Sequence, residues 1–316
     1  MRLSPAAYRR VTIVAAVLVG VIIVTGAAVR LTGSGLGCPS WPNCSPGRLT
    51  PQDATSYHAM VEFVNRTFTG AVSLGVIAAV LGALIRSPRR RDLTWLSLGL
   101  VGGVVGQIVL GGVTVLTDLN PFAVMGHFVL SILILGDAVV LVHRAGLPDG
   151  VPTEPSGRPV ERRAAVAQFL LTCVVVVTGT VVTNSGPHAG DLDAKRFDLR
   201  LTDIARVHSA TTILLLLTVV ATVLVIGRAG LGPARLRALS WLLVVVVAQM
   251  AVGYTQYLTG VPALLVAVHI LGAVLVFTAS LRVLLVNWRP AFGPAAMHDG
   301  PGPDRVVDEP ERVVAR

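Results

Sequence analysis

The chain has 316 residues, of which 53% are hydrophobic and only 14% are charged, and its mean hydropathy is +0.73. These values are typical of a polytopic membrane protein and exclude an ordinary soluble domain. The formal net charge is +9, but the basic residues cluster on one side of the apolar stretches. The charge therefore predicts membrane topology and contact with membrane lipid, and no nucleic-acid partner.

Eight stretches are apolar enough to cross a membrane as helices, each of which needs about 20 residues. They are long and lack strand alternation, so an all-α protein is expected and not a membrane barrel. An uncleaved first helix is favoured over a signal peptide because seven spans follow it. The predicted spans are Val11–Arg30, Ser56–Ile85, Leu93–Thr117, Phe122–Val142, Arg163–Thr183, Thr202–Ile226, Arg237–Leu258 and Pro262–Val286.

One segment of the chain occurs twice. In residues 107–127 and again in 249–269, Gly follows Gln by four residues, Leu-Thr by nine and ten, and His by twenty. The repetition predicts two parallel four-helix repeats, related by a pseudo-two-fold axis along the membrane normal. We expect an N-terminal repeat over 1–144, a linker over 145–161, a C-terminal repeat over 162–288 and a disordered tail over 289–316. The basic clusters place both termini and the linker in the cytoplasm.

The three cysteines fall into two groups. Cys173 lies inside the fifth predicted span, where it is expected to act as a small apolar residue. Cys38 and Cys44 lie in the loop after the first span, which the topology places outside the cell. Thiols oxidise there, so a disulfide is favoured. A zinc site is the alternative, although no nearby His or further Cys completes a ligand set.

Three histidines fall inside predicted spans that enter the membrane from outside. His127, His208 and His269 lie at similar depths, roughly 9–12 Å from the outer face at 1.5 Å per residue. A lone buried His is most often structural, but three at matched depth favour ligation. Two imidazoles from facing helices hold haem iron, whereas a non-haem metal usually needs carboxylates as well. The offset between the repeats places the position of a fourth histidine near Asn65, which has an amide side chain and no imidazole.

The second span carries three polar residues on one face. His58, Glu62 and Asn65 are spaced four and three apart, as neighbours on a helix surface are. A carboxylate at the depth of Glu62 is energetically expensive, which indicates a proton-handling role. A structural ion pair with Arg66 at helical spacing is an equally strong interpretation.

Three arginines lie toward the outer side, where haem propionates would be expected. Arg30, Arg66 and Arg206 are candidates for binding them. The competing interpretation is that their side chains extend to the lipid–water interface.

Several motifs, taken in order, resemble the haem A synthase family, in its actinobacterial type. The resemblance runs from about Arg10 to Val286 and covers nearly the whole chain. Its carriers are RLTGSGLGCPSWPNC after the first span, EFVNR in the second, LGGVTVLT before the His127 helix, TGTVVTNSGPHAGD after the fifth span and VPALLVAVH in the eighth.

The resemblance implies an oxidoreductase of the bacterial plasma membrane. It would oxidise the ring D methyl group of haem O by successive hydroxylations, through an alcohol and a gem-diol that loses water to the formyl group of haem A. It further implies that His208 and His269 hold a haem b cofactor in the C-terminal repeat, and that His127 binds the iron of the substrate haem in the N-terminal repeat.

The resemblance also assigns residues outside the iron sites. Glu62 matches a functional glutamate, and Cys38 and Cys44 match a pair of loop cysteines found in many bacterial members. A haem O synthase that supplies the substrate and an aa3-type oxidase that receives the product are implied as partners.

This chain departs from the family pattern on two helices. The family commonly has His-Arg where this chain has Asn65-Arg66, and again where it has His208-Ser209. In the N-terminal half, either His58 reaches the iron from about 10 Å farther out, or His127 is the single ligand. A single ligand would leave one coordination position open for oxygen activation.

Two other classes of protein fit the same residues. A non-enzymatic dihaem b-type cytochrome would use the same histidine pairs for electron transfer. A parallel-repeat transporter would use matched histidines to bind a substrate or relay protons. Glu62 and the asymmetry between the halves favour the enzyme.

Overall fold

The structure, a computed structural model, describes residues 2–53, 55–151, 153–226 and 232–290. Most of the tail expected to be disordered therefore lies outside the described residues. The elements are α1 (Pro5–Leu31), α2 (Tyr57–Ile85), α3 (Arg91–Leu116), α4 (Pro121–Ala145), β1 (Thr153–Pro155), α5 (Pro159–Ser185), α6 (Leu201–Ala221), the π-helix η1 (Thr222–Ile226), α7 (Pro233–Leu258), α8 (Ala263–Leu285) and β2 (Trp288–Pro290).

The predicted all-α, eight-span architecture is confirmed. Within the described residues, eight helices are long and apolar enough to span a membrane, and each corresponds to one predicted stretch. Several boundaries differ from the prediction, most of all at the start of α1, which begins at Pro5 where Val11 was expected, and of α7, which begins at Pro233 where Arg237 was expected. Helix α5 begins four residues before the expected start, with Pro159 in its first turn, where a missing N–H is harmless. The sixth span changes from α- to π-helix at Thr222.

Local sequence explains where two of the helices begin. Ser4 precedes α1, and its hydroxyl accepts a hydrogen bond from the backbone N–H of Ala7 at 3.2 Å. Asn120 precedes α4 in the same way and accepts from the backbone N–H of Phe122 at 3.0 Å. In both cases proline follows the cap at once, as expected at a helix start.

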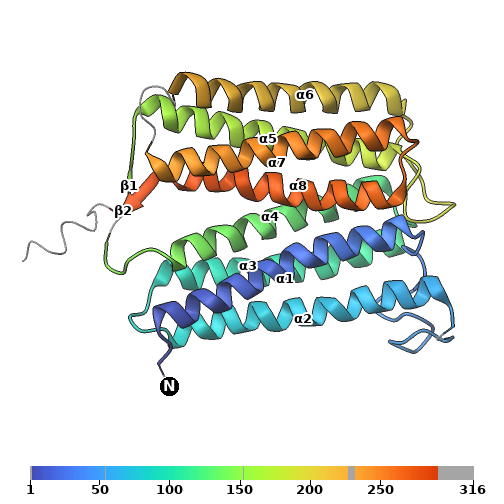
Figure 1. Cartoon of the computed structure of the whole chain (residues 1–316). Coiled ribbons are helices and arrows are strands. Elements are labelled where there is room, and N and C mark those ends of the chain that lie inside the picture. Colours follow the sequence, from blue (N-terminus) through green and yellow to red (C-terminus); the bar gives the residue numbers. More distant parts are fainter. Residues whose placement is uncertain (1, 54, 152, 227–231, 291–316) are drawn as a thin grey trace, which may run out of the picture.

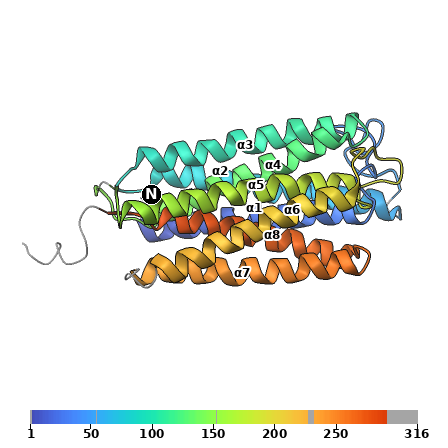
Figure 2. The same cartoon turned by 90° about the horizontal axis from the view of Figure 1, so that it is seen from above.

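The two sets of four helices lie side by side (Figures 1 and 2). Helices α2 and α6 lie at opposite edges in Figure 1, and α3 and α7 at opposite edges in Figure 2, as a two-fold arrangement of the halves requires. The core of the first half includes Phe277 and Leu281 of α8. The halves therefore share a core, while apolar side chains on the outer faces remain exposed and suit contact with lipid.

Glycines bring α3 very close to α4. A Cβ placed on Gly103 would lie 2.5 Å from the Cγ1 atom of Ile134, and one on Gly106 would lie 3.1 Å from a methyl group of Leu130. Small residues at helix contacts allow such approach inside a membrane, where lipid gives no hydrophobic drive for helices to associate. The same contact continues outward to Gly111, which faces His127.

Ion pairs and a short strand pair close the end of the bundle that carries the N-terminus. Asp149 pairs with Arg86 at 2.7 Å, and Asp92 pairs with Arg90 at 2.7 Å and with Arg144 at 3.1 Å. Strand β1, inside the predicted linker, pairs antiparallel with β2 after α8. Two residues assigned to the tail, 289 and 290, therefore belong to this strand pair.

Replacing Gly103 by Ala tests the close helix contact. Ile134 is buried and cannot yield freely, so the added methyl group should destabilise the protein by about 1–3 kcal/mol. Thermal unfolding in detergent measures this change. Gly102→Ala is the matched control, because a Cβ there meets no heavy atom within 4 Å among the described residues. Equal melting temperatures for the two variants would contradict the proposed packing.

Candidate functional site

The repeated segment makes the same contact in each half. Gln107 Nε2 donates to the backbone oxygen of His127 at 3.0 Å, and Gln249 Nε2 donates to that of His269 at 2.7 Å. Each glutamine therefore joins one helix to the next beside the histidine, α3 to α4 and α7 to α8. The repeat seen in the sequence is thus a repeat of a structural contact.

Each of the three intramembrane histidines packs against a glycine on the preceding helix. A Cβ would lie 3.3 Å from Cε1 of His127 if placed on Gly111, and 3.0 Å from Cε1 of His269 if placed on Gly253. A Cβ placed on Gly179 of α5 would likewise lie 3.0 Å from Cε1 of His208. The glycines give the imidazole rings room between the helices, and larger residues would displace them.

In the second half, two of these histidines face each other. The ring centroids of His208 and His269 are 6.3 Å apart, with an interplanar angle of 75°. Two metal–nitrogen bonds of about 2 Å each, plus the distance from each nitrogen to its ring centre, give a similar separation. The distance between the two rings therefore fits the size of a single metal ion between them.

A threonine orients the first ring of this pair. The hydroxyl of Thr178 donates to the backbone oxygen of Val175 at 3.1 Å and lies 3.0 Å from Nδ1 of His208. Since the hydroxyl hydrogen is used, Nδ1–H is assigned as the donor to Thr178. Nε2 of His208 then keeps its lone pair, the form that a metal ligand requires.

The first half lacks the matching imidazole. Thr25-Gly26 on α1 repeats Thr178-Gly179 on α5, and Thr25 donates to the side-chain oxygen of Asn65 at 3.0 Å. Asn65 is thus the counterpart of His208, as the offset between the repeats predicts. A Cβ on Gly26 would have no heavy atom of another described element within 4 Å. The space filled by an imidazole in the second half is open here.

His58 lies farther out. It is the second residue of α2, its side chain is exposed, and its Nδ1 lies 3.0 Å from the hydroxyl of Ser34 in the loop after α1. Asn65 lies seven residues deeper on the same helix, which corresponds to about 10 Å. The structure therefore does not bring His58 to the corner that Asn65 occupies.

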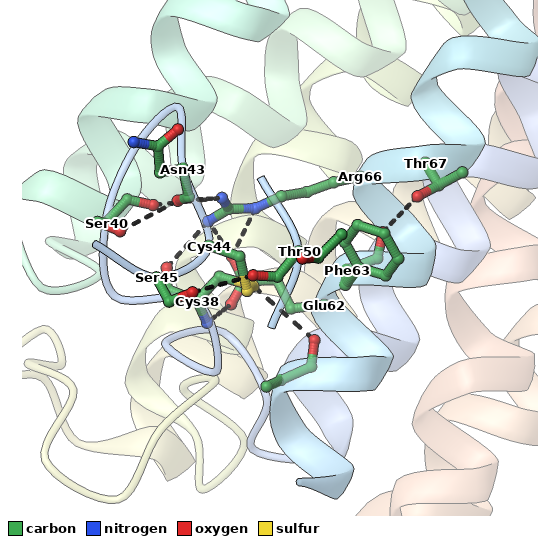
Figure 3. The surroundings of a disulfide bond; sticks show 11 residues. Cys38, Ser40, Asn43, Cys44, Ser45, Thr50, Glu62, Phe63, Arg66 and Thr67 are labelled. Atoms are coloured by element: carbon green, nitrogen blue, oxygen red, sulfur yellow. Dashed lines mark hydrogen bonds and ion pairs between the residues drawn. A yellow bond between two sulfur atoms is a disulfide. The ribbon is translucent and has the colours of Figure 1, made fainter. Parts of the chain in front are cut away.

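Glu62 and Arg66 hold the cysteine loop onto α2 (Figure 3). The predicted disulfide between Cys38 and Cys44 is present, which removes the zinc alternative. The buried carboxylate of Glu62 accepts the backbone N–H of Cys38 at 2.7 Å and pairs with Arg66 at 2.5 Å. The ion pair predicted as one of the two interpretations of Glu62 is therefore formed.

Arg66 uses all of its donors in this arrangement. Besides Glu62, it donates to the backbone oxygens of Cys38, Ser40 and Asn43 at 3.0–3.2 Å. A guanidinium group has five N–H donors, and these contacts engage each of them. Arg66 therefore has no donor left for a haem propionate unless the loop moves.

The same loop reaches the histidine of the N-terminal half. A Cβ placed on Gly112 of α3 would lie 2.8 Å from the indole ring of Trp41. The adjacent Gly111 packs against the imidazole ring of His127. Trp41 lies between the two disulfide cysteines. The loop held by Glu62 and Arg66 thus lies beside the His127 site, a relation that residue spacing does not reveal.

The other two candidate arginines differ from each other. Arg30 joins the halves, donating to Asn184 and to the backbone oxygens of Thr183 and His188 at 2.5–3.1 Å. Arg206 has an 82% exposed side chain and lies 3.6 Å from Asp203. Arg30 is committed to protein acceptors, whereas Arg206 is accessible at the outer end of α6.

One intramembrane acid was not among the predicted site residues. Asp137 lies on α4 beside Gly99 of α3, and it makes no hydrogen bond or ion pair within the described part of the chain. The signal was present in the sequence, because an acidic residue inside a long apolar stretch is rare and usually functional.

The donor set suits haem better than a bare metal ion. No group of three or more His, Cys, Asp or Glu is placed to hold a metal among the described residues. Haem supplies four nitrogens of its own and needs only one or two side chains. The facing pair in the second half meets this need, and the single His127 meets it in the first half.

Comparison with known proteins agrees with this geometry. Residues 9–191 match the COX15-CtaA family, described as cytochrome oxidase assembly protein. The match covers more than half of the chain. The chain belongs to this family.

Similar proteins include the "Heme A synthase" of Geobacillus kaustophilus, 33% identical over 110 residues, which are 34% of this chain and 33% of the relative. The protein of the same name from Listeria welshimeri is 33% identical over 122 residues, 38% and 40% of the two chains. The one from Geobacillus thermodenitrificans is 30% identical over 148 residues, 46% and 44%. These matches therefore span less than half the length of each relative.

The contacts of Arg66 generate a prediction for the cysteine loop. Arg66→Lys keeps the positive charge beside Glu62 but loses the planar fork that binds several carbonyls. Backbone amides between Cys38 and Cys44 should then exchange hydrogen faster, which exchange mass spectrometry measures. Arg206→Lys is the control at an exposed position and should leave this loop unchanged. Unchanged exchange in the Arg66 variant would contradict the assigned contacts.

Proposed function

We propose that this chain is a membrane oxidoreductase of haem A biosynthesis that oxidises the ring D methyl group of haem O to a formyl group. Family membership and the names of the relatives support the pathway. The asymmetry of the two halves is the observation that supports the proposed oxidation of haem O. His208 and His269 face each other, whereas the counterpart of His208 in the first half is Asn65.

The two halves are assigned different tasks. His208 and His269 would hold a haem b cofactor, which would supply electron transfer. His127 would bind the iron of haem O, with an open position on the side of Asn65. Bound haem supplies the redox chemistry, while the protein sets which iron is accessible.

The loop residues would shape the substrate site. Trp41 packs on Gly112 of α3, one residue from the glycine that contacts His127, and would exclude water from the reacting methyl group. Glu62 and Arg66 fix that loop. A proton-handling role for Glu62 stays a prediction, as does propionate binding by Arg66, and Arg206 offers a more accessible cation for a propionate.

The proposed setting is the bacterial plasma membrane, with both termini and the linker in the cytoplasm and the cysteine loop outside. The end of the bundle with the N-terminus carries the basic clusters, as the positive-inside rule requires. A haem O synthase that delivers substrate and an aa3-type oxidase that receives product are the proposed partners.

Pigment analysis of membranes that express the chain with a supply of haem O tests the proposal. Appearance of haem A supports it. A red protein that leaves haem O unchanged with a reductant and oxygen would indicate the electron-transfer cytochrome instead. A colourless purified protein without a Soret band would contradict both haem-based functions and favour the transporter.

Single alanine variants separate the two candidate ligands of the substrate haem. His127→Ala should abolish conversion of haem O, because it removes the only imidazole of that site. His58→Ala should retain conversion, because His58 contacts Ser34 in the outer loop. Product analysis measures both variants. Loss of conversion in His58→Ala, with His127→Ala active, would reverse the assignment.

Asn65→His tests the open position directly. The new imidazole would face His127 next to Gly26, where there is space for it. The substrate haem should then become six-coordinate, so its absorption and magnetic resonance spectra should change to a low-spin form while conversion falls. Asn65→Gln is the control without an imidazole. Full activity with an unchanged spin state in Asn65→His would contradict the proposal that the iron of haem O has an open position on the side of Asn65.

A further inference from the structure

A small cavity lies between α5, α7 and the residues that follow α8. Figure 1 shows β1 and β2 at this end of the bundle. The volume of the cavity is about 10 Å³, and its walls include Glu161, Gln168, Arg235 and Asn287. These residues come from α5, α7 and the end of α8. None of the described histidines lines the cavity, and it belongs to none of the functions proposed above.

Four buried polar atoms at this cavity have no hydrogen-bond partner among the described residues. They are Glu161 Oε2, Gln168 Oε1, Arg235 Nε and Asn287 Oδ1. Gln168 is fully buried, and Glu161 and Asn287 are nearly so. Glu161 Oε2 lies 3.1 Å from another nitrogen of Arg235 in an ion pair. Unsatisfied buried groups are costly and rare in folded proteins, so four around one cavity indicate a bound partner.

The contacts of the two amides fix which atoms face the cavity. Gln168 Nε2 lies 2.7 Å from the hydroxyl of Thr222, whose hydrogen is donated to a backbone oxygen. Asn287 Nδ2 donates to the backbone oxygen of Val283 at 2.7 Å. Both amide nitrogens therefore act as donors elsewhere, and both amide oxygens are left for the cavity. The cavity offers three acceptors and one donor.

We propose that this cavity is a binding site for one ordered water molecule. Water can donate to two of the three oxygens and accept from Arg235 Nε, and the volume is close to the lower limit for one molecule. A metal cation would meet the positive guanidinium group of Arg235. An anion would meet the carboxylate of Glu161 and two amide oxygens. A small neutral molecule with both donors and acceptors fits all four atoms.

The site has a structural consequence, because two of its wall residues form hydrogen bonds with the linker between the halves. Arg235 donates to the hydroxyl of Ser156 at 2.8 Å, and the backbone N–H of Ser156 donates to the backbone oxygen of Asn287 at 2.8 Å. The water therefore completes a polar cluster that attaches the linker to α5, α7 and α8. It also solvates the buried ion pair of Glu161 with Arg235.

X-ray hydroxyl-radical footprinting of the full-length protein tests the proposal, since radicals form at bound water and label the side chains next to it. Leu239 lines the cavity and is 3% exposed, whereas Leu242, one turn farther along α7, is 0% exposed and does not line it. Labelling of Leu239 well above that of Leu242 is expected. Gln168→Met removes one acceptor and should abolish the difference.

Two outcomes would overturn the proposal. One is equal, background labelling of Leu239 and Leu242 in the unmodified protein, a result that does not depend on whether the variant folds. The other is an experimental density map at water-resolving resolution in which the four polar atoms pair with one another, or in which the cavity contains an ion. A single water peak within hydrogen-bond distance of at least three of them would confirm it.

Discussion

The close approach of one helix backbone to the imidazole on the next is the constraint on which the rest of the site depends. Gly111, Gly179 and Gly253 each face a histidine at a distance that leaves little room for another side chain. Inside a membrane, such contacts replace the hydrophobic effect as the means of helix association. They also set the depth and direction of each ring, so the packing of the bundle and the placement of the histidines have the same cause.

Asymmetry between the halves gives this arrangement its functional meaning. The Thr-Gly pair that supports His208 recurs on α1 beside Asn65, so the supporting structure is present in both halves while the imidazole is present in only one. A fully coordinated iron suits electron transfer, and an iron with an open position suits oxygen chemistry. The cysteine loop, fixed by Glu62 and Arg66, lies beside the half with the open corner.

Much of the fold was predictable because the bilayer restricts it so strongly. Spans of about 20 apolar residues must be helices, and histidines within them stand out because polar groups there are expensive. Even the correspondence of Asn65 with His208 followed from the offset between the repeats. The same reasoning applies to Asp137, which was not predicted as a site residue because it lies outside the repeated segments.

Contacts made by loops and long side chains were not predictable in this way. Nothing in the spacing of Arg30 indicates that it donates to the loop after α5, more than 150 residues away. Likewise, the approach of Trp41 to Gly112 depends on how an irregular loop folds over the bundle. Such contacts depend on tertiary geometry that no local pattern encodes, and they decide which polar groups remain available to a ligand.

Electron paramagnetic resonance of the purified protein, before and after addition of haem O, tests the central claim most directly. We expect a low-spin signal from the haem that His208 and His269 would hold, and a separate high-spin signal that develops as haem O binds at His127. Two low-spin signals of equal weight in the fully loaded protein would contradict it, because both irons would then have two strong protein ligands.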